Sequence, residues 1–166
     1  NLHIYAASNP NAMWQDAGRA ISPNGKTALV IGTGDIGSHF ARLCKNVGMT
    51  TIGIRRNPAV EAPGVDYMVG FDSLDDVLQY ADVIAMSVPS TPATYHLLNA
   101  ERIASLKPDS IIINAGRGNA INSQALADAL AEGRIRGAAL DVTEPEPLPA
   151  DSPLARALKR FVKSAG

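Results

Sequence analysis

Short apolar runs alternate with longer amphipathic segments along most of this chain. The runs are rich in Val, Ile, Leu and Ala, and they predict buried strands at residues 27–31, 50–54, 67–69, 82–88, 110–114 and 137–142. Between the runs, apolar residues recur every three or four positions, as Ile36, Phe40, Leu43 and Val47 do. This spacing predicts helices at residues 35–47, 74–80, 99–106 and 123–132, and a further helix is expected at residues 2–7.

Strands that alternate with helices in this way predict βαβ units and a parallel sheet that is covered on both faces. Six such strands in 166 residues are typical of an α/β, doubly wound, Rossmann-type dinucleotide-binding domain. In such a sheet the ligand lies at the carboxyl ends of the strands. We therefore expect one dinucleotide-binding domain over residues 25–154, preceded by a connector over residues 1–24 and followed by a basic tail over residues 155–166.

The composition narrows the class of protein. Apolar residues make up 46% and charged residues 19%, which favours a globular core over disorder. Fifteen basic and sixteen acidic side chains give a net charge of −1, which excludes a generally basic nucleic-acid binder and an acidic tail protein. The single cysteine, Cys44, excludes an internal disulfide framework and a Cys-rich zinc site. Its helical spacing with Phe40 and Val47 predicts a buried packing role.

The sequence carries no sign of a membrane segment. No apolar run approaches the roughly 18–20 residues that a membrane span needs. Residues 1–10 lack the basic start and apolar centre of a signal peptide. We therefore expect a cytoplasmic protein with neither a membrane nor a nucleic acid as its partner.

A glycine-rich turn follows the first predicted strand and opens the first predicted helix. It reads Gly32-Thr33-Gly34-Asp35-Ile36-Gly37 and fits G-x-G-x-x-G. In dinucleotide-binding proteins the first glycine permits the tight turn, the second lets a pyrophosphate approach the backbone, and the third lets helix and strand pack closely. The helix N-terminus adds free N–H groups and the positive end of a dipole. The turn predicts a dinucleotide site, and a plain strand–helix turn is the alternative.

The end of the second predicted strand bears on the choice between NAD and NADP. An NAD site usually places an Asp or Glu about 20 residues after the motif begins. Here that stretch reads Gly53-Ile54-Arg55-Arg56-Asn57, and the nearest acidic residue, Glu61, comes only after Pro58. A guanidinium pairs with a 2′-phosphate that a carboxylate would repel. Arg55 and Arg56 therefore favour NADP(H), and NAD(H) stays open if both are only a solvated strand end.

Three further segments are similar, in order and spacing, to motifs of one enzyme family. Residues 88–99 (VPSTPATYHLLN) resemble its P-x-T-x-x-T segment, residues 107–118 (KPDSIIINAGRG) its strand ending in A/G-R-G, and residues 137–148 (GAALDVTEPEPL) its G-A-x-L-D-V-x-x-x-E-P-L segment. With the glycine turn, they resemble the D-isomer-specific 2-hydroxyacid dehydrogenases. That family includes glyoxylate/hydroxypyruvate reductases, D-lactate dehydrogenases and phosphoglycerate dehydrogenases. The resemblance covers most of residues 25–154.

The resemblance implies roles for individual residues. Arg117 would bind the carboxylate and carbonyl of a 2-oxo acid through two N–H groups and so aim the carbonyl at the nicotinamide. Glu146, with Glu144 as the less favoured candidate, would pair with a catalytic histidine and keep it basic enough to hold its proton. Asp141 would lie near the nicotinamide. The other positions matched to the cofactor lining are Val88, Pro89, Thr94, Ala115 and Gly116.

The chain departs from the family pattern near its end. The family histidine follows shortly after the segment that is Ser152-Pro153-Leu154 here, yet residues 158–166 contain no histidine. The three histidines present, His3, His39 and His96, do not match that position. The family also has a second, substrate-covering domain, so the chain resembles an excised cofactor domain. We expect the isolated chain to bind cofactor but to turn over poorly or not at all.

The function expected from the sequence is hydride transfer between NADP(H) and a small 2-oxo or 2-hydroxy acid, such as glyoxylate or hydroxypyruvate. By analogy with the family, the cofactor domain would also form a homodimer. A non-catalytic nucleotide-binding or dimerisation module is the alternative, which the missing histidine favours and the presence of Arg117 and Glu146 disfavours. The chain lacks the Tyr-x-x-x-Lys pair of the short-chain dehydrogenases, which argues against that Rossmann family.

Overall fold

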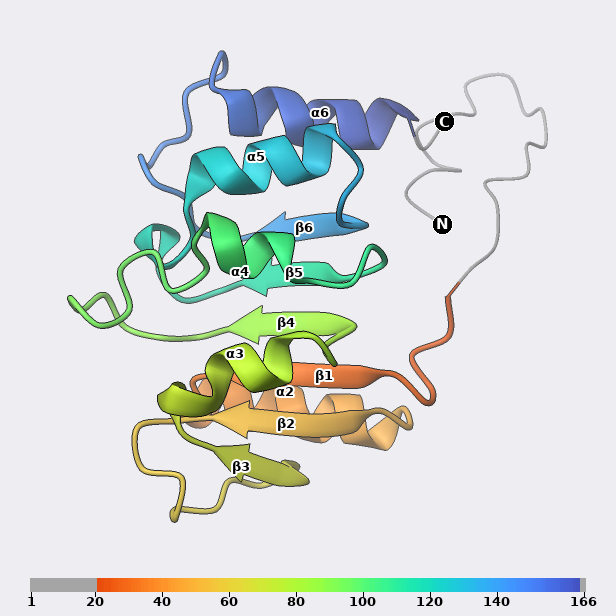
Figure 1. Cartoon of the computed structure of the whole chain (residues 1–166), viewed down its shortest axis with the longest axis vertical. Helices are drawn as coiled ribbons and strands as arrows, with labels where there is room; N and C mark the ends of the chain where they lie inside the picture. The colour runs from red at the N-terminus through yellow and green to blue at the C-terminus, as the bar shows by residue number, and fades with distance from the viewer. Residues whose placement is uncertain (1–20, 165–166) are drawn as a thin grey trace.

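The computed structural model describes residues 21–164, and the helix expected at residues 2–7 lies outside them. Six parallel strands form one sheet in the order β3-β2-β1-β4-β5-β6 (Figure 1). The strands are β1 (Thr27–Ile31), β2 (Thr50–Ile54), β3 (Tyr67–Val69), β4 (Val83–Met86), β5 (Ile111–Asn114) and β6 (Gly137–Leu140). The helices are α2 (Asp35–Asn46), α3 (Leu74–Leu78), α4 (Ala100–Ala104), α5 (Ser123–Ala131) and α6 (Pro153–Ser164), with 3-10 helices η1 (Phe71–Ser73) and η2 (Gly118–Ala120). This topology confirms the predicted doubly wound fold.

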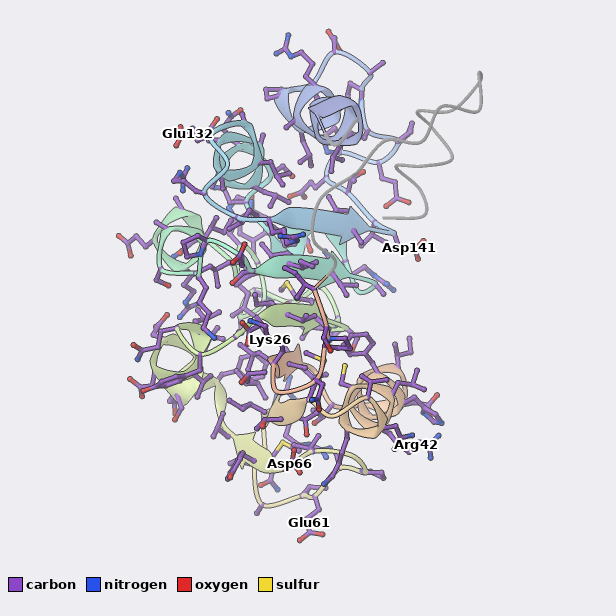
Figure 2. The ribbon with its side chains drawn as sticks, turned by 90° about the vertical axis from the view of Figure 1, so that its right-hand side faces the viewer. Lys26, Arg42, Glu61, Asp66, Glu132 and Asp141 are labelled. Atoms are coloured by element: carbon purple, nitrogen blue, oxygen red, sulfur yellow. The ribbon has the colours of Figure 1, made fainter. Side chains whose placement is uncertain are left out.

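Helices cover the sheet from both sides. Figures 1 and 2 show α2 against one face and α3, α4 and α5 against the other. The chain leaves β1 toward β2 on one side and leaves β4 toward β5 on the other, so β1 and β4 are the neighbours at which the strand order reverses. Crossovers that run in opposite directions open a crevice at the carboxyl ends of these two strands. The described helices include none that is long and apolar enough to cross a membrane.

The core consists almost entirely of aliphatic side chains on the two faces of the sheet. Alternate residues of β1 point to opposite faces: Leu29 and Ile31 join the main core, and Ala28 packs with Cys44 and Met49 beneath α2. Cys44 is buried, as its spacing predicted, and burial raises the pKa of its thiol. Burial of the central strands on both faces explains why their sequences are continuous apolar runs rather than alternating ones.

The apolar spacing of α2 correctly predicts a helix, but of its large apolar residues only Phe40 packs against the core beneath the helix. Ile36, Leu43 and Val47 are 61%, 63% and 51% exposed. The buried face is formed by the small residues Gly37, Ala41 and Cys44. Small side chains let the helix lie close to β1 directly after the glycine turn, and Ile36, Leu43 and Val47 remain on the outer surface.

The segment predicted as a basic tail over residues 155–166 forms most of a helix. Helix α6 begins at Pro153, and the Ser152 hydroxyl accepts a hydrogen bond from the Ala155 N–H at 3.1 Å. Serine at the N-cap followed by proline at the first helical position is a helix start signal, which the composition of residues 155–166 obscured. Leu154 and Ala157 are buried, and α6 packs against α5.

The amino ends of the strands lie opposite the crevice. There the partly buried Asp82 carboxylate, just before β4, contacts residues at or before the starts of β1 and β5. Asp82 accepts a hydrogen bond from the Thr27 N–H at 2.8 Å and lies 3.4 Å from the Lys26 ammonium and 3.3 Å from that of Lys107. Burial raises the pKa of the Asp82 carboxyl, but the hydrogen bond from Thr27 and the two ammonium groups outweigh it and hold the pKa below its usual range.

We expect Asp82→Asn to lower the free energy of unfolding by about 1 kcal/mol near pH 7, because it leaves two ammonium groups without their partly buried carboxylate. A depressed native pKa stabilises the fold above the unfolded value of about 4, and this contribution is lost as the pH falls through the native pKa. The difference between variant and parent should therefore vanish in acid. Urea denaturation at several pH values measures it, with Asp109→Asn, an exposed carboxyl near Arg136, as the control. A constant difference across this pH range would contradict the expectation.

Candidate functional site

The glycine-rich turn lies at the carboxyl end of β1, where it connects to α2. Gly32 has a φ of +92°, a left-handed conformation that favours glycine, and its N–H donates to the Ile54 carbonyl of β2 at 2.8 Å. A Cβ atom on Gly37 would come within 2.0 Å of the Gly32 carbonyl oxygen. These two glycines therefore allow the turn and the close approach of α2 to the strand, as the motif predicted.

The second glycine of the motif has a different surrounding. Gly34 is the N-cap residue of α2, and no side chain caps this helix end. A Cβ atom built on Gly34 would meet nothing within 4 Å. The turn therefore leaves open space directly above the uncapped N-terminus of a twelve-residue helix. Such an end offers unpaired N–H groups and the positive end of the helix dipole, so the site fits the pyrophosphate of a dinucleotide.

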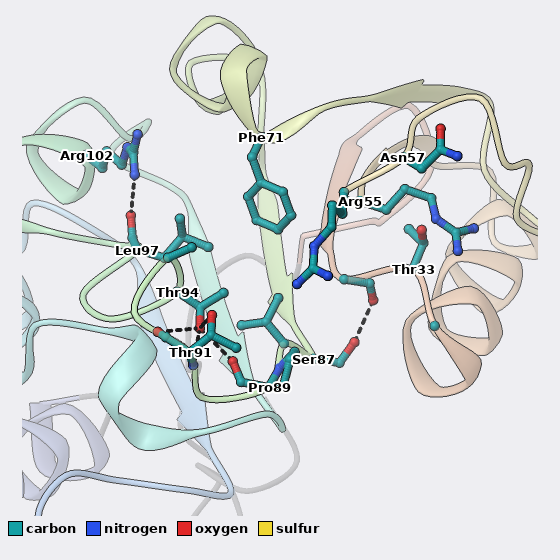
Figure 3. Close-up of a pocket in the computed structure, with 15 residues that line it drawn as sticks. Thr33, Arg55, Asn57, Phe71, Ser87, Pro89, Thr91, Thr94, Leu97 and Arg102 are labelled. Carbon is teal, nitrogen blue, oxygen red and sulfur yellow. Dashed lines mark hydrogen bonds between the residues drawn. The ribbon is translucent and has the colours of Figure 1, made fainter.

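This space belongs to a cavity of about 630 Å³ at the crevice between β1 and β4. Figure 3 shows the side chains around it. Of the residues singled out from the sequence, the cavity is lined by Gly32, Gly34, Arg55, Arg56, Val88, Pro89 and Thr94. Its volume is within the range of small-molecule and cofactor sites. The structure thus brings together residues from the glycine turn, the end of β2 and the segment after β4, as the fold predicted.

Positive charge gathers at the β2 side of the cavity. Arg55 and Arg56 line it together with Asn57, and Arg56 is exposed. The Arg55 guanidinium donates to the Val60 carbonyl at 3.1 Å, and so ties the end of β2 to the loop that follows. No Asp or Glu is among the described residues that line the cavity. The arrangement suits a phosphate group at this end.

The segment after β4 forms the opposite wall. The Thr94 hydroxyl donates to the Pro89 carbonyl at 2.6 Å and accepts from the Thr91 N–H at 2.9 Å. Thr94 is buried, so these bonds fix the loop against the strand ends rather than offering a polar group to the cavity. The Arg102 guanidinium donates to the Leu97 carbonyl at 2.9 Å and pairs with Asp75 of α3. The Arg102–Asp75 ion pair thereby joins α3 and α4 at the rim of the cavity.

The turn after β5 presents Arg117. The side chain of Asn114, which is buried, accepts from the Gly116 N–H at 3.0 Å and donates to the Arg117 carbonyl at 2.9 Å. Both groups of the amide are thus used to hold the turn. Arg117 itself is exposed and donates to the Gly116 carbonyl at 2.8 Å. A Cβ atom on Gly116 would meet the Val88 backbone at 2.8 Å, so this turn lies against the cavity wall.

The segment after β6 reaches the same turn. A Cβ atom on Gly118 would come within 2.1 Å of the Thr143 backbone. Glu144 lies next along the chain, with its carboxylate 3.9 Å from His96 Nε2. Glu146 is exposed and is two residues further on.

Several residues singled out from the sequence are not among those that line the cavity. They are Asp35, Ile36, Gly37, Ala115, Gly116, Arg117, Asp141, Glu144 and Glu146. Asp141, like Arg117, is exposed and lies beyond the end of its strand. The cavity and the turns after β5 and β6 are neighbouring parts of one sheet edge, because the carboxyl ends of parallel strands meet there.

Other lining residues were not found by sequence reasoning. They are Thr33, Asn57, Phe71, Ser87, Thr91, Ala93, Leu97 and Arg102. Figure 3 shows Phe71 and Leu97 pointing into the same space from different segments. Phe71 belongs to η1, directly after the short strand β3. The signal for this residue was its place just beyond a predicted strand, at the end of the sheet where this fold binds its ligand.

Comparison with known proteins gives one consistent result. The family model described as "D-isomer specific 2-hydroxyacid dehydrogenase, NAD binding domain" matches residues 1–164. The chain is similar to glyoxylate/hydroxypyruvate reductase B of Yersinia pestis (strain Pestoides F), with 41% identity over 130 residues. The alignment covers 78% of this chain and 40% of that protein. The chain spans about half or less of the length of the curated relatives it matches.

Solved structures agree with the sequence match. A D-isomer specific 2-hydroxyacid dehydrogenase family protein from Aeromonas salmonicida subsp. salmonicida A449 has a TM-score of 0.85 and 42% identity, covering 93% of this chain and 49% of that one. A D-isomer specific 2-hydroxyacid dehydrogenase from Xanthobacter autotrophicus Py2, in complex with NADPH and MES, has a TM-score of 0.79 and 31% identity. The alignment covers 93% of this chain and 63% of that one.

Proposed function

The chain belongs to the D-isomer specific 2-hydroxyacid dehydrogenase family, and we propose that the protein uses NADP(H) to interconvert a small 2-oxo acid and its 2-hydroxy acid. The chain forms the NAD binding domain of this family and binds a nicotinamide dinucleotide. A relative named glyoxylate/hydroxypyruvate reductase supports an acid of that size as the substrate. A similar structure that contains NADPH supports the choice of cofactor.

The observation that carries the NADP(H) proposal is the charge at the end of β2. Arg55 and Arg56 line the cavity at the point where a dinucleotide fold holds the adenosine ribose, and no acidic residue accompanies them among the described lining residues. A 2′-phosphate carries about two negative charges and would be stabilised by the guanidinium groups. An NAD site usually has a carboxylate there for the ribose hydroxyls.

In the proposed position of the cofactor, its pyrophosphate lies above Gly34 at the N-terminus of α2, and its 2′-phosphate lies toward Arg55 and Arg56. The segment from Val88 to Thr94 would then border the nicotinamide half. The cofactor supplies a hydride donor or acceptor at its nicotinamide ring. The residues of the chain bind and orient it beside the turn that carries Arg117.

Substrate orientation falls to Arg117 in this proposal. Its planar guanidinium can hold the carboxylate and the carbonyl of a 2-oxo acid at once, which fixes the carbonyl carbon relative to the nicotinamide. Asn114 holds the turn from which Arg117 projects. Glu146 would pair with a catalytic histidine and favour its protonated form. Glu144, which lies beside His96, is the second candidate for that role.

Titration of the purified 166-residue chain with NADPH and with NADH tests the cofactor proposal. Nicotinamide fluorescence reports binding of either cofactor. We expect NADPH to bind at least about tenfold more tightly, the effect of one charge-assisted contact. Tighter binding of NADH would reverse the cofactor choice and keep the family. Binding of neither cofactor would contradict the proposed function of this chain.

We further propose that the domain forms a homodimer through an exposed apolar stripe along α2, which consists of Ile36, Leu43 and the C-cap residue Val47. A row of large apolar side chains along one helix face marks a protein–protein contact. Leu43→Glu should shift the mass measured by light scattering from dimer to monomer. Tyr80→Glu adds the same charge at an exposed aromatic residue elsewhere and should leave the mass unchanged. A parent chain that is monomeric at high concentration would contradict the proposal.

A further inference from the structure

Ser87 lies at the crevice between the carboxyl ends of β1 and β4. It is the first residue after β4, and it makes two bonds to the end of β1. Its N–H donates to the Ile31 carbonyl at 2.9 Å, and its hydroxyl donates to the Gly32 carbonyl at 2.7 Å. The backbone pairing of β1 with β4 ends at Ile31 and Met86. The hydroxyl of Ser87 thus extends the connection between the two strands by one residue, across the crevice (Figure 3).

The Gly32 carbonyl can reach Ser87 because of the left-handed backbone at this glycine, with its φ of +92°. On its other side Gly32 is held by the bond from its N–H to Ile54. The first glycine of the turn is therefore tied to β2 through its nitrogen and to β4 through its oxygen. The backbone of β2 supplies the first tie whatever its side chains are, whereas the second depends on the side chain of Ser87.

The same bond supports the start of α2. A Cβ atom on Gly37 would lie 2.0 Å from the Gly32 oxygen and 3.0 Å from Ser87 Oγ. The first turn of α2 therefore rests directly on the Ser87–Gly32 bond. Gly34, the uncapped N-cap residue, lies between these two contacts in the chain. The positions of the N–H groups at the start of α2 therefore depend on how Gly32 and Gly37 are held.

We propose that Ser87 is a positioning residue for the pyrophosphate of the dinucleotide. Its hydroxyl fixes the first glycine and the N-terminus of α2 relative to β4, so that the N–H groups above Gly34 are aimed at the phosphates before the cofactor arrives. Preorganised donors bind a charged group more tightly than donors that must be ordered on binding. This inference rests on the proposed placement of the cofactor in the cavity.

Ser87→Ala removes the bond to the Gly32 carbonyl and keeps the backbone bond from residue 87 to the Ile31 carbonyl. We expect the dissociation constant of NADPH to rise about fivefold, the size of one neutral hydrogen bond. Adenosine 2′-monophosphate, which has the adenine and the 2′-phosphate but no pyrophosphate, should bind equally to parent and variant in an NMR titration. Ser87→Thr keeps the hydroxyl and should restore most of the NADPH affinity. A residue that only stabilised the fold would not separate the two ligands.

The sheet offers a matched control at its other end. Ser110 is buried, and its hydroxyl donates to the Ala81 carbonyl of the neighbouring segment at 2.9 Å. Ser110→Ala should lower the melting temperature like Ser87→Ala and leave NADPH binding unchanged. Equal NADPH affinity of Ser87→Ala and parent, or equal losses for both ligands, would overturn the inference alone. Absence of NADPH and NADH binding by the parent would overturn the proposed function and this inference together.

Discussion

Replacing Gly34 by alanine is expected to weaken cofactor binding by about 10- to 100-fold and to lower the free energy of unfolding by at most about 1 kcal/mol, because alanine is a poorer N-cap residue than glycine. The backbone of Gly34 is extended, with φ −74° and ψ −155°, and therefore lies outside the left-handed region that favours glycine. The added methyl group meets no protein atom within 4 Å. It enters the space proposed for the pyrophosphate and separates the phosphates from the N–H groups of α2. Losing one such charge-assisted hydrogen bond costs about 1.5–3 kcal/mol.

Gly37→Ala is the matched comparison, because it adds the same methyl group at a position where protein atoms lie in contact. Alanine is favoured over glycine inside a helix by about 1 kcal/mol. Here the methyl group would approach the Gly32 carbonyl oxygen to 2.0 Å, so the helix or the turn must move. We expect this variant to lose both thermal stability and cofactor affinity, because the displaced turn no longer aims its N–H groups.

NADPH fluorescence and thermal denaturation, measured on both variants, separate the two effects. The expected pattern is a melting temperature close to that of the parent with weak binding for Gly34→Ala, and a strongly lowered melting temperature with weak binding for Gly37→Ala. Tight NADPH binding by Gly34→Ala would show that the phosphates lie elsewhere. Unfolding of Gly34→Ala would show that the open space above this residue is needed by the chain itself.

The strands and the glycine turn could be predicted from the sequence because they depend on local rules. Buried parallel strands need continuous apolar runs, as in residues 27–31, and only glycine fits the conformation of residue 32 and the contact of residue 37. The basic end of β2 could be predicted for the same reason, because Arg55 and Arg56 directly follow the last residue of the strand.

The parts of the site that the sequence did not predict depend on which segments lie close together in space, and the linear pattern does not contain this information. Phe71 and Leu97 line one cavity because β3 and the segment after β4 end at the same edge of the sheet. The role of Ser87 requires knowing that Gly32 turns its carbonyl toward β4. The outward direction of Leu43 on α2 was hidden because helical spacing identifies a face without saying what it contacts.

Reversing the charge of Arg56 is expected to abolish the preference for NADPH. Arg56 is the exposed member of the pair, whereas the Arg55 guanidinium already donates to the Val60 carbonyl. Arg56→Asp removes one cation and adds a carboxylate that repels a 2′-phosphate. We expect NADPH affinity to fall about 100-fold, corresponding to about 3 kcal/mol. NADH affinity should stay the same or rise, because a carboxylate can accept hydrogen bonds from the ribose hydroxyls.

Arg55→Asp should also lower NADPH affinity, but by a different route. It removes a cation from the cavity and at the same time frees the loop at Val60 from the end of β2. Both cofactors should then lose affinity, NADPH more than NADH, and the melting temperature should fall. Arg42→Asp makes the same change of charge on the outer surface of α2, so it controls for the net charge of the chain. Equal NADPH affinity for Arg42→Asp and Arg56→Asp would contradict a specific phosphate contact.

Salt gives an independent measure of the same contact. If the 2′-phosphate is bound by guanidinium groups near the surface, the NADPH advantage should shrink as the ionic strength rises from about 0.05 to 0.5 M, where screening shortens to a few ångströms. The NADH affinity, which lacks this contact, should change much less. In Arg56→Asp the salt dependence of the two cofactors should become alike. A salt-independent NADPH preference that survives this substitution would mean that the selectivity arises from shape at the adenosine pocket, around Phe71 and Leu97, rather than from charge at the end of β2.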